Sequence, residues 1–378
     1  MAEIEREEYL FGDLPDAMVK ELLNHTLPVA ESIHKRIQCL QDHREELRQK
    51  AQQAGIICCK TNLDVPREPS VVGIDGSYQV HRLTALDLCA AAAIAVEGTV
   101  KEAHRHWPEP HYRIWVDGVP HQGQPTNALR GLMVSMEIEL AAVSPHDLVL
   151  LDGSFASLII YINQGVSQLG EVASPLADAL REHWESNQLF KKLLELLQSQ
   201  RTVAVPKFTS HNELVNKAGI QLHKNLMNID GKTLATLILD PGEYTKPLSL
   251  DHPLSSYHLP APADNKKLNQ AMHDLSVVYF RPYAWTAAVR LEIPSAVAHN
   301  KSRLAMVLEG IQRQLFSPAV REPYPLFLAD QMVKSLGAGI KVAEQVIAQQ
   351  IAGESIDEET TLLFLQSYRT ESGRGDTL

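Results

Sequence analysis

The chain has 378 residues, of which 44% are hydrophobic and 21% charged, and its formal net charge is −11 at pH 7. This is an ordinary globular composition, which excludes the disordered and fibrous classes. The acidic balance argues against wholesale electrostatic binding of nucleic acid, although the segment from Lys191 to Lys232 carries a local excess of positive charge.

The predicted elements begin with a helical leader. Residues 14–53 have apolar residues at helical intervals, and Pro28 is expected to break or kink the helix. The elements expected after it are strands at 70–75, 84–98 and 112–118, a helix at 128–143, a strand at 147–152, a helix near 174–198, a strand at 201–207, a long loop at 241–264, a hairpin with strands near 276–280 and 285–293, and helices over 301–351. Three strands followed by alternating helices and strands predict an α/β fold, a mixed sheet flanked by helices.

The sequence also predicts where the protein acts. Its four cysteines show no metal spacing and no disulfide framework, which indicates a reducing compartment. The acidic N-terminus lacks the features of a signal peptide, and the longest apolar run, from Ala85 to Val96, is interrupted by Asp87 and is too short to span a membrane. We therefore expect a cytoplasmic protein without a membrane segment.

Two stretches of the chain repeat one pattern. VVGIDGSYQ and LVLLDGSFA each combine an apolar run, Asp-Gly-Ser and an aromatic residue, and they place Asp75 and Asp152 at equivalent positions. We expect each Asp at the end of a buried strand, at the sheet edge where open α/β folds bind ligands. Asp-Gly is also a common turn dipeptide, but its repetition in this context favours a functional site.

Two kinds of site fit this repeat. An actin-like or sugar-kinase-like ATPase would grip phosphate with an Asp-x-Gly loop, but here Gly follows Asp directly and a second Gly-rich loop is lacking. A site for Mg²⁺ or Mn²⁺ needs several carboxylates at one edge. The helix at 128–143 supplies a further acid, and its geometry leaves Glu137 and Glu139 equally suitable, because each flanks the apolar stripe.

The order of motifs resembles that of the NurA nuclease family. VVGIDGS, a helix with an acid, LVLLDGS and VAVPKFTSHNEL are similar to its first motifs, and VVYFRPYAWTAAVRLEIP and EPYPLFLADQMVKSL to its last two, so that the resemblance covers about residues 70–336. It implies an RNase H-like fold and a Mn²⁺-dependent (or Mg²⁺-dependent) nuclease, a 5′-3′ exonuclease and single-strand endonuclease acting on single- and double-stranded DNA ends. It also implies a homodimer that works with a HerA-like hexameric ATPase in DNA end processing or phage defence.

The resemblance assigns roles to four residues. Asp75, Glu137 and Asp152 would bind the metal, and Asp330 would complete the catalytic set. Lys207, which lies just past a predicted strand, is expected to contact DNA by holding a backbone phosphate as a point charge. The spacing within the family favours Glu137 over Glu139 as the helix ligand.

Two family residues are replaced in the last motif. Asp330 stands where the family has His, and Glu322 stands near the place of a family Tyr. This departure raises the alternative of a catalytically weak or inactive structural partner of the ATPase. We expect the chain to divide into a helical N-terminal segment, residues 1–64, and a NurA-like nuclease domain, residues 65–378.

Overall fold

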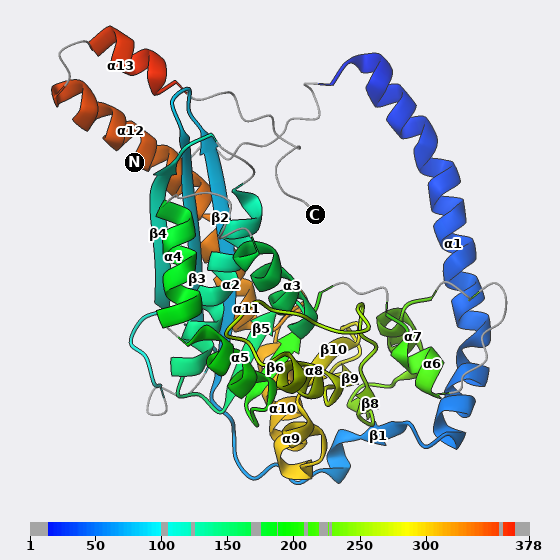
Figure 1. The fold of residues 1–378 in the computed structure, drawn as a ribbon. Helices are drawn as coiled ribbons and strands as arrows, with labels where there is room; N and C mark the ends of the chain where they lie inside the picture. The colour runs from blue at the N-terminus through cyan, green and yellow to red at the C-terminus, as the bar shows by residue number, and fades with distance from the viewer. Residues whose placement is uncertain are drawn as a thin grey trace.

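A ten-stranded mixed sheet forms the centre of the molecule (Figure 1). The computed structural model describes residues 14–99, 105–121, 125–167, 175–186, 188–207, 211–218, 226, 229–354 and 358–366. The strands are β1 (Ile57–Cys59), β2 (Val71–Arg82), β3 (Asp87–Glu97), β4 (His111–Val119), β5 (Leu148–Asp152), β6 (Thr202–Val205), β7 (Glu243–Thr245), β8 (Leu248–Ser249), β9 (Ser276–Arg281) and β10 (Val289–Ile293). Their order is β1-β7-β9-β10-β6-β5-β2-β3-β4, and β8 pairs with β9.

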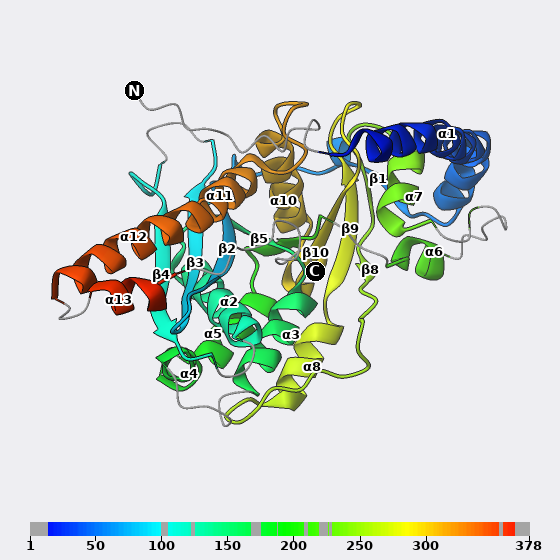
Figure 2. The same ribbon diagram turned by 90° about the horizontal axis from the view of Figure 1, so that it is seen from above.

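Helices cover both faces of this sheet. They are α1 (Asp16–Gln53), α2 (Thr126–Val143), α3 (Phe155–Val166), α4 (Pro175–Arg181), α5 (Leu189–Leu197), α6 (Glu213–Ala218), α7 (Gly231–Ile238), α8 (Asn265–His273), α9 (Ser295–Ala298), α10 (Lys301–Gln314), α11 (Tyr324–Lys334), α12 (Leu336–Glu354) and α13 (Glu358–Phe364). Figure 2 shows α2, α3, α4, α5 and α8 on one face and α10, α11 and α12 on the other. Among the helices that the structure describes, none is both long and apolar enough to cross a membrane.

Strand β5 shows how the sheet divides the core. It lies between β2 and β6 and runs parallel to both. Leu148 and Leu150 belong to the cluster under α10 and α11, whereas Val149 and Leu151 belong to the cluster under α2, α3 and α5. Because both faces of β5 are covered, its sequence is a continuous apolar run rather than an alternating one.

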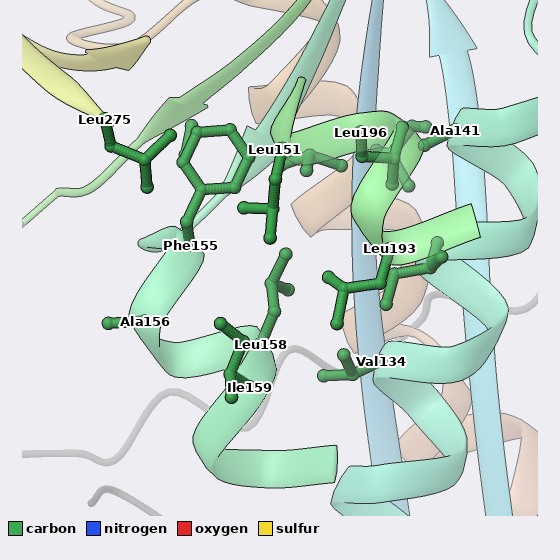
Figure 3. Close-up of a cluster of buried hydrophobic side chains, with 14 of the residues drawn as sticks. Val134, Ala141, Leu151, Phe155, Ala156, Leu158, Ile159, Leu193, Leu196 and Leu275 are labelled. Atoms are coloured by element: carbon green, nitrogen blue, oxygen red, sulfur yellow. The ribbon is translucent and has the colours of Figure 1, made fainter. Parts of the chain in front are cut away.

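The start of α3 is held by the larger of these clusters. Phe155 follows the second Asp-Gly-Ser directly and is fully buried. It packs in the same core as Leu151, Leu158 and Leu193 (Figure 3), and Ser154 caps the helix by accepting a hydrogen bond from the backbone N–H of Ser157. This packing fixes the direction in which the chain leaves β5.

The predicted mixed α/β sheet is confirmed, but several predicted elements are wrong. Helix α1 continues through Pro28 as one helix, so the predicted break is wrong, whereas a kink there stays a prediction. The helix predicted near 174–198 is divided by a π-helical turn at Glu182–Ser186 and by Gln188, whose φ of 53° is left-handed. The loop predicted at 241–264 contains β7 and β8, and β1 was not predicted; these short strands carry too few residues for a periodic signal.

Candidate active site

Three neighbouring strands bring the predicted residues to one level of the sheet. Strands β2, β5 and β6 are parallel, and Ile74 is level with Leu151 while Asp152 is level with Val205. Asp75 therefore lies beside Asp152. Lys207 follows two residues after the end of β6, so Asp75 within β2, Asp152 at the end of β5 and Lys207 after β6 supply charged groups at one level of the sheet.

The two Asp-Gly-Ser motifs differ in backbone structure. Asp152 ends β5, and Gly153 turns the chain into α3 with a φ of +81°, a conformation that favours glycine. The prediction that Asp75 also ends its strand is wrong. Strand β2 continues to Arg82. Its neighbour β5 ends beside Asp75, but β3 on the other side of β2 pairs with it as far as Arg82.

Gly76 serves a different purpose from Gly153. A Cβ at Gly76 would lie 2.5 Å from Oε1 of Glu137, so the missing side chain lets the carboxylate on α2 approach β2 beside Asp75. Each Asp accepts a hydrogen bond from the next N–H, at 2.8 Å for Asp75 and 2.9 Å for Asp152. The two motifs thus share the hydrogen bond between the Asp carboxylate and the next N–H. Their glycines differ, because Gly153 allows the chain to turn and Gly76 allows Glu137 to approach.

Asp330 reaches the site from helix α11. A Cβ at Gly73 would lie 2.5 Å from the backbone nitrogen of Leu326, so α11 packs directly on the backbone of β2. This contact brings Asp330 to the two strand carboxylates. One carboxylate oxygen each from Asp75, Asp152 and Asp330 lie within 4.8 Å of one another.

The structure separates the two glutamates of α2. Glu137 is 6% exposed and faces Gly76, with Asp75 and Asp152 close enough to raise its pKa, although burial is the larger cause of that rise. Glu139 instead contacts His183 at 3.0 Å and Lys192 at 3.6 Å. Burial would raise the pKa of Glu139, but these cationic partners lower it overall. Only Glu137 lies in the carboxylate cluster.

Lys207 lies among carboxylates. Its Nζ is 3.0 Å from Oδ2 of Asp152, 3.0 Å from Oε2 of Glu322 and 3.5 Å from Oδ1 of Asp330. Burial alone would lower the pKa of Lys207, but Asp152 and Glu322 raise it overall. A second ammonium, that of Lys334, is 2.7 Å from Oδ2 of Asp330, and with Lys207 it keeps the pKa of Asp330 below its usual range although burial opposes this.

Negative charge exceeds positive charge in this cluster. It combines five carboxylates with two ammonium groups: Asp75, Glu137, Asp152, Glu322 and Asp330, against Lys207 and Lys334. Burial, and then the charge of Asp152, raise the pKa of Asp75 to about 7. Hard divalent cations prefer converging carboxylate oxygens, and a cation here would relieve both the repulsion and the burial of charge. The donor set therefore fits Mn²⁺ or Mg²⁺.

Three contributors to this arrangement were not predicted as site residues. Glu322 was noted only for replacing a family Tyr, yet its carboxylate contacts Lys207. Lys334 follows Asp330 by four positions on α11, a spacing that predicts their contact once the helix is recognised. Gly73 gave no signal beyond its presence in a strand, where glycine often marks a close backbone approach.

The comparisons with known proteins identify the family of this chain. Residues 69–335 match the NurA domain family, so the chain belongs to the NurA family. The predicted family, and with it the enzyme class of a metal-dependent nuclease, are confirmed. A search of curated proteins gave no match.

Solved structures of NurA proteins resemble this chain. The NurA nuclease from Sulfolobus solfataricus is 14% identical with a TM-score of 0.58, and the match covers 91% of this chain and 99% of that one. The predicted fold class is thereby confirmed. A NurA structure with manganese (13% identity, TM-score 0.49, 85% and 98% covered) and one bound to dAMP and manganese (13%, 0.48, 88% and 99%) also match.

Proposed function

We propose that this protein hydrolyses phosphodiester bonds of DNA at the carboxylate cluster of Asp75, Glu137, Asp152 and Asp330. The observation that carries the proposal is the approach of three carboxylates, from β2, β5 and α11 of a NurA-family chain, to within 4.8 Å of one another. We favour this nuclease over a phosphate-binding ATPase, because the family match covers both Asp-Gly-Ser motifs. The substrates we expect are single- and double-stranded DNA ends.

The metal we expect is Mn²⁺, with Mg²⁺ as the alternative. Asp75, Asp152 and Asp330 would hold it, with Glu137 beside them. When bound, such an ion lowers the pKa of a water molecule and stabilises negative charge on phosphate oxygens. A solved NurA structure contains manganese and dAMP, and it is the shared family that leads us to expect the same metal here.

Lys207 has a defined part in this proposal. Its ammonium offsets the charge of Asp152, Asp330 and Glu322 before substrate arrives. A phosphate of the DNA backbone would share this ammonium as a point charge. Because its raised pKa keeps Lys207 protonated, it would position the phosphate and would not act as a general base.

The replacement of the family His by Asp330 bears on activity. Asp330 is 9% exposed, and its carboxylate lies with those of Asp75 and Asp152. An oxygen donor therefore stands where the cluster needs one, which supports an active enzyme over the alternative of an inactive structural partner. Absence of metal-dependent cleavage by the wild-type protein would favour that alternative.

The test uses end-labelled single- and double-stranded DNA in Mn²⁺, Mg²⁺ or EDTA. We expect cleavage that requires metal and is lost in Asp152→Asn. The matched control is Asp117→Asn: Asp117 also precedes a glycine and accepts its N–H at 2.7 Å, but it is exposed on β4 outside the cluster. Equal cleavage by Asp152→Asn and the control, with unchanged melting, would overturn the site assignment.

We extend the proposal to partners. The exposed side of α1 carries an apolar stripe, which we expect to meet either a second copy in a homodimer or a HerA-like ATPase; its residues are Met18, Leu22, Leu23, Leu27, Val29, Ile33 and Ile37. Large exposed apolar patches are typical of protein interfaces. Co-purification with such an ATPase, lost on replacing Leu27 and Ile33 by Ser, would support this role, whether in DNA end processing or phage defence. The 5′-3′ polarity is part of the same proposal, and labelling either end of the substrate would test it.

A further inference from the structure

An exposed tryptophan lies close to the carboxylate cluster. Trp285 is in the connection between β9 and β10, and 43% of it is exposed. Its ring is stacked on that of Tyr283, with centroids 4.9 Å apart and planes 7° from parallel. Aromatic rings are the surfaces on which nucleic-acid bases stack in proteins, so this pair offers a surface for a flat ligand.

Hydrogen bonds fix the connection that carries the pair. The hydroxyl of Tyr283 donates to the carbonyl of Gln312 at 3.1 Å, and the side-chain amide of Gln312 donates to the carbonyl of Pro282 at 3.2 Å. The hydroxyl of Thr286 donates to the carbonyl of Tyr283 at 3.0 Å. Trp285 is therefore held on an ordered turn anchored to α10, and little conformational entropy remains to be lost on binding.

Trp285 and Lys207 line the same cavity. This cavity has a volume of about 570 Å³, and its lining includes three cationic side chains, those of Lys207, Lys232 and Arg321, and one carboxylate, that of Glu322. Lys207 and Glu322 both belong to the carboxylate cluster, so they connect the cavity to it. An aromatic surface next to cations that track a phosphate backbone is the arrangement by which proteins hold single-stranded nucleic acid.

We infer that Trp285 stacks on an unpaired base of the DNA strand whose phosphate lies at Lys207. This inference rests on the proposed function, since it assigns the cavity to the substrate of the neighbouring cluster. A paired base presents its face to its neighbours in the duplex, so stacking on Trp285 requires a single-stranded or frayed end. Stacking on Trp285 thereby gives the site a preference for unpaired ends over blunt duplex.

The test measures binding in EDTA, so that its outcome does not depend on metal-dependent cleavage. The probe is a fluorescein-labelled oligothymidylate of about 12 nucleotides, followed by anisotropy, beside a blunt hairpin duplex. The variants are Trp285→Ala, Trp285→Phe and, as a matched control, Tyr112→Ala. Tyr112 is an exposed aromatic residue on β4, an edge strand separated from β10 by β6, β5, β2 and β3. A second series of oligonucleotides carries one abasic residue at successive positions.

We expect Trp285→Ala to weaken single-strand binding about tenfold or more, with a smaller effect on the blunt duplex. Trp285→Phe should recover most of the affinity, and Tyr112→Ala should retain all of it. An abasic residue at one position of the oligonucleotide should weaken its binding to the wild type and should not weaken its binding to Trp285→Ala any further. A merely structural role of Trp285 would not produce this pattern.

Two results would overturn the proposed stacking of a base on Trp285. Unchanged single-strand affinity in Trp285→Ala is one, and abasic sensitivity that persists in that variant is the other. Failure of the nuclease proposal would look different: binding would depend on Trp285, but the wild type would cleave nothing in Mn²⁺.

Discussion

Two clusters of buried charge in this protein differ in how their carboxylates are compensated. In the cluster of β10, Arg290 contacts both Glu213 and Glu292. The hydroxyl of Tyr279 donates to Glu213 at 2.9 Å, and the backbone N–H of Phe155 donates to Glu292 at 3.0 Å. Each of these two buried carboxylates has fixed donors within the protein, as buried charges require.

The carboxylate cluster at Asp75 is only partly compensated, because two ammonium groups, those of Lys207 and Lys334, face five carboxylates. Burial raises the pKa of Asp75 and of Glu137, and the neighbouring carboxylates add to the rise. The pKa of Glu292 is raised by burial too, although Arg290 and the N–H of Phe155 work against it. The difference teaches that burial of acids alone does not identify a functional site. An excess of acids over the protein's own donors does, because a ligand must then supply the missing charge.

The largest expected effect is on catalysis. Asp75→Asn should lower the cleavage rate about a thousandfold or more, because a neutral amide removes one anionic ligand from the expected ion. The measurement is single-turnover cleavage of end-labelled DNA in Mn²⁺, with circular dichroism to establish folding. A well-folded variant that keeps more than about a tenth of the rate would contradict the assignment.

The next effect is on stability, in the compensated cluster. Arg290→Met should destabilise the fold by about 3–5 kcal/mol, because it leaves Glu213 and Glu292 buried without their cation. The loss should be greater at pH 8 than at pH 5, since Glu292, whose pKa is raised by burial, can take up a proton at the lower pH. Urea unfolding at the two pH values measures this.

A neutral triple variant is the control for that prediction. Combining Arg290→Met with Glu213→Gln and Glu292→Gln removes the uncompensated charge and should recover part of the lost stability. If the single and triple variants are equally unstable, the loss of stability comes from altered side-chain packing and not from uncompensated charge.

A smaller effect, of opposite sign, is expected from Asp75. Its carboxyl keeps a proton in the folded metal-free protein up to about pH 7, whereas the usual value is 3.8. The folded state therefore loses stability as pH rises from about 4 to 7, and Asp75→Asn avoids that loss. The free energy of unfolding of this variant should exceed that of the wild type by roughly 2–4 kcal/mol at pH 8 in EDTA, and by little at pH 4. An equal difference at both pH values in urea unfolding would refute the linkage.

The smallest effect sharpens the comparison within α2. Glu139 has His183 and Lys192 as partners, so Glu139→Gln should leave the cleavage rate within about threefold of the wild type. Glu137→Gln should reduce it strongly, because Glu137 lies beside Asp75. Side-by-side rates of the two variants in Mn²⁺ decide the question, and a reversed order would move the site to the other flank of the helix.

The parts of the site that the sequence predicted are those that local patterns specify. Asp75 and Asp152 follow apolar runs, and α2 has a continuous apolar stripe, so strand, helix and acid could each be recognised within a short window. The choice between Glu137 and Glu139 could not be made in this way. It depends on Gly76 and His183, which approach α2 from distant segments.

The course of β2 and the position of α11 were beyond local patterns for a similar reason. Strand β2 passes Asp75 without turning because β3 supplies hydrogen bonds as far as Arg82. The approach of α11 depends on the absence of a side chain at Gly73. Tertiary pairing decides both, and it can override the turn preference of Asp-Gly.

The packing of α11 on Gly73 has a consequence for the timing of activity in the cell. Asp75 and Asp152 are translated early and Asp330 late, and the last of these joins the others only when α11 docks on β2. A nascent or prematurely terminated chain thus carries two of the three clustered carboxylates and no complete site. Under the proposed function, a chain terminated before α11 would therefore lack one ligand of the expected metal and would not cleave DNA.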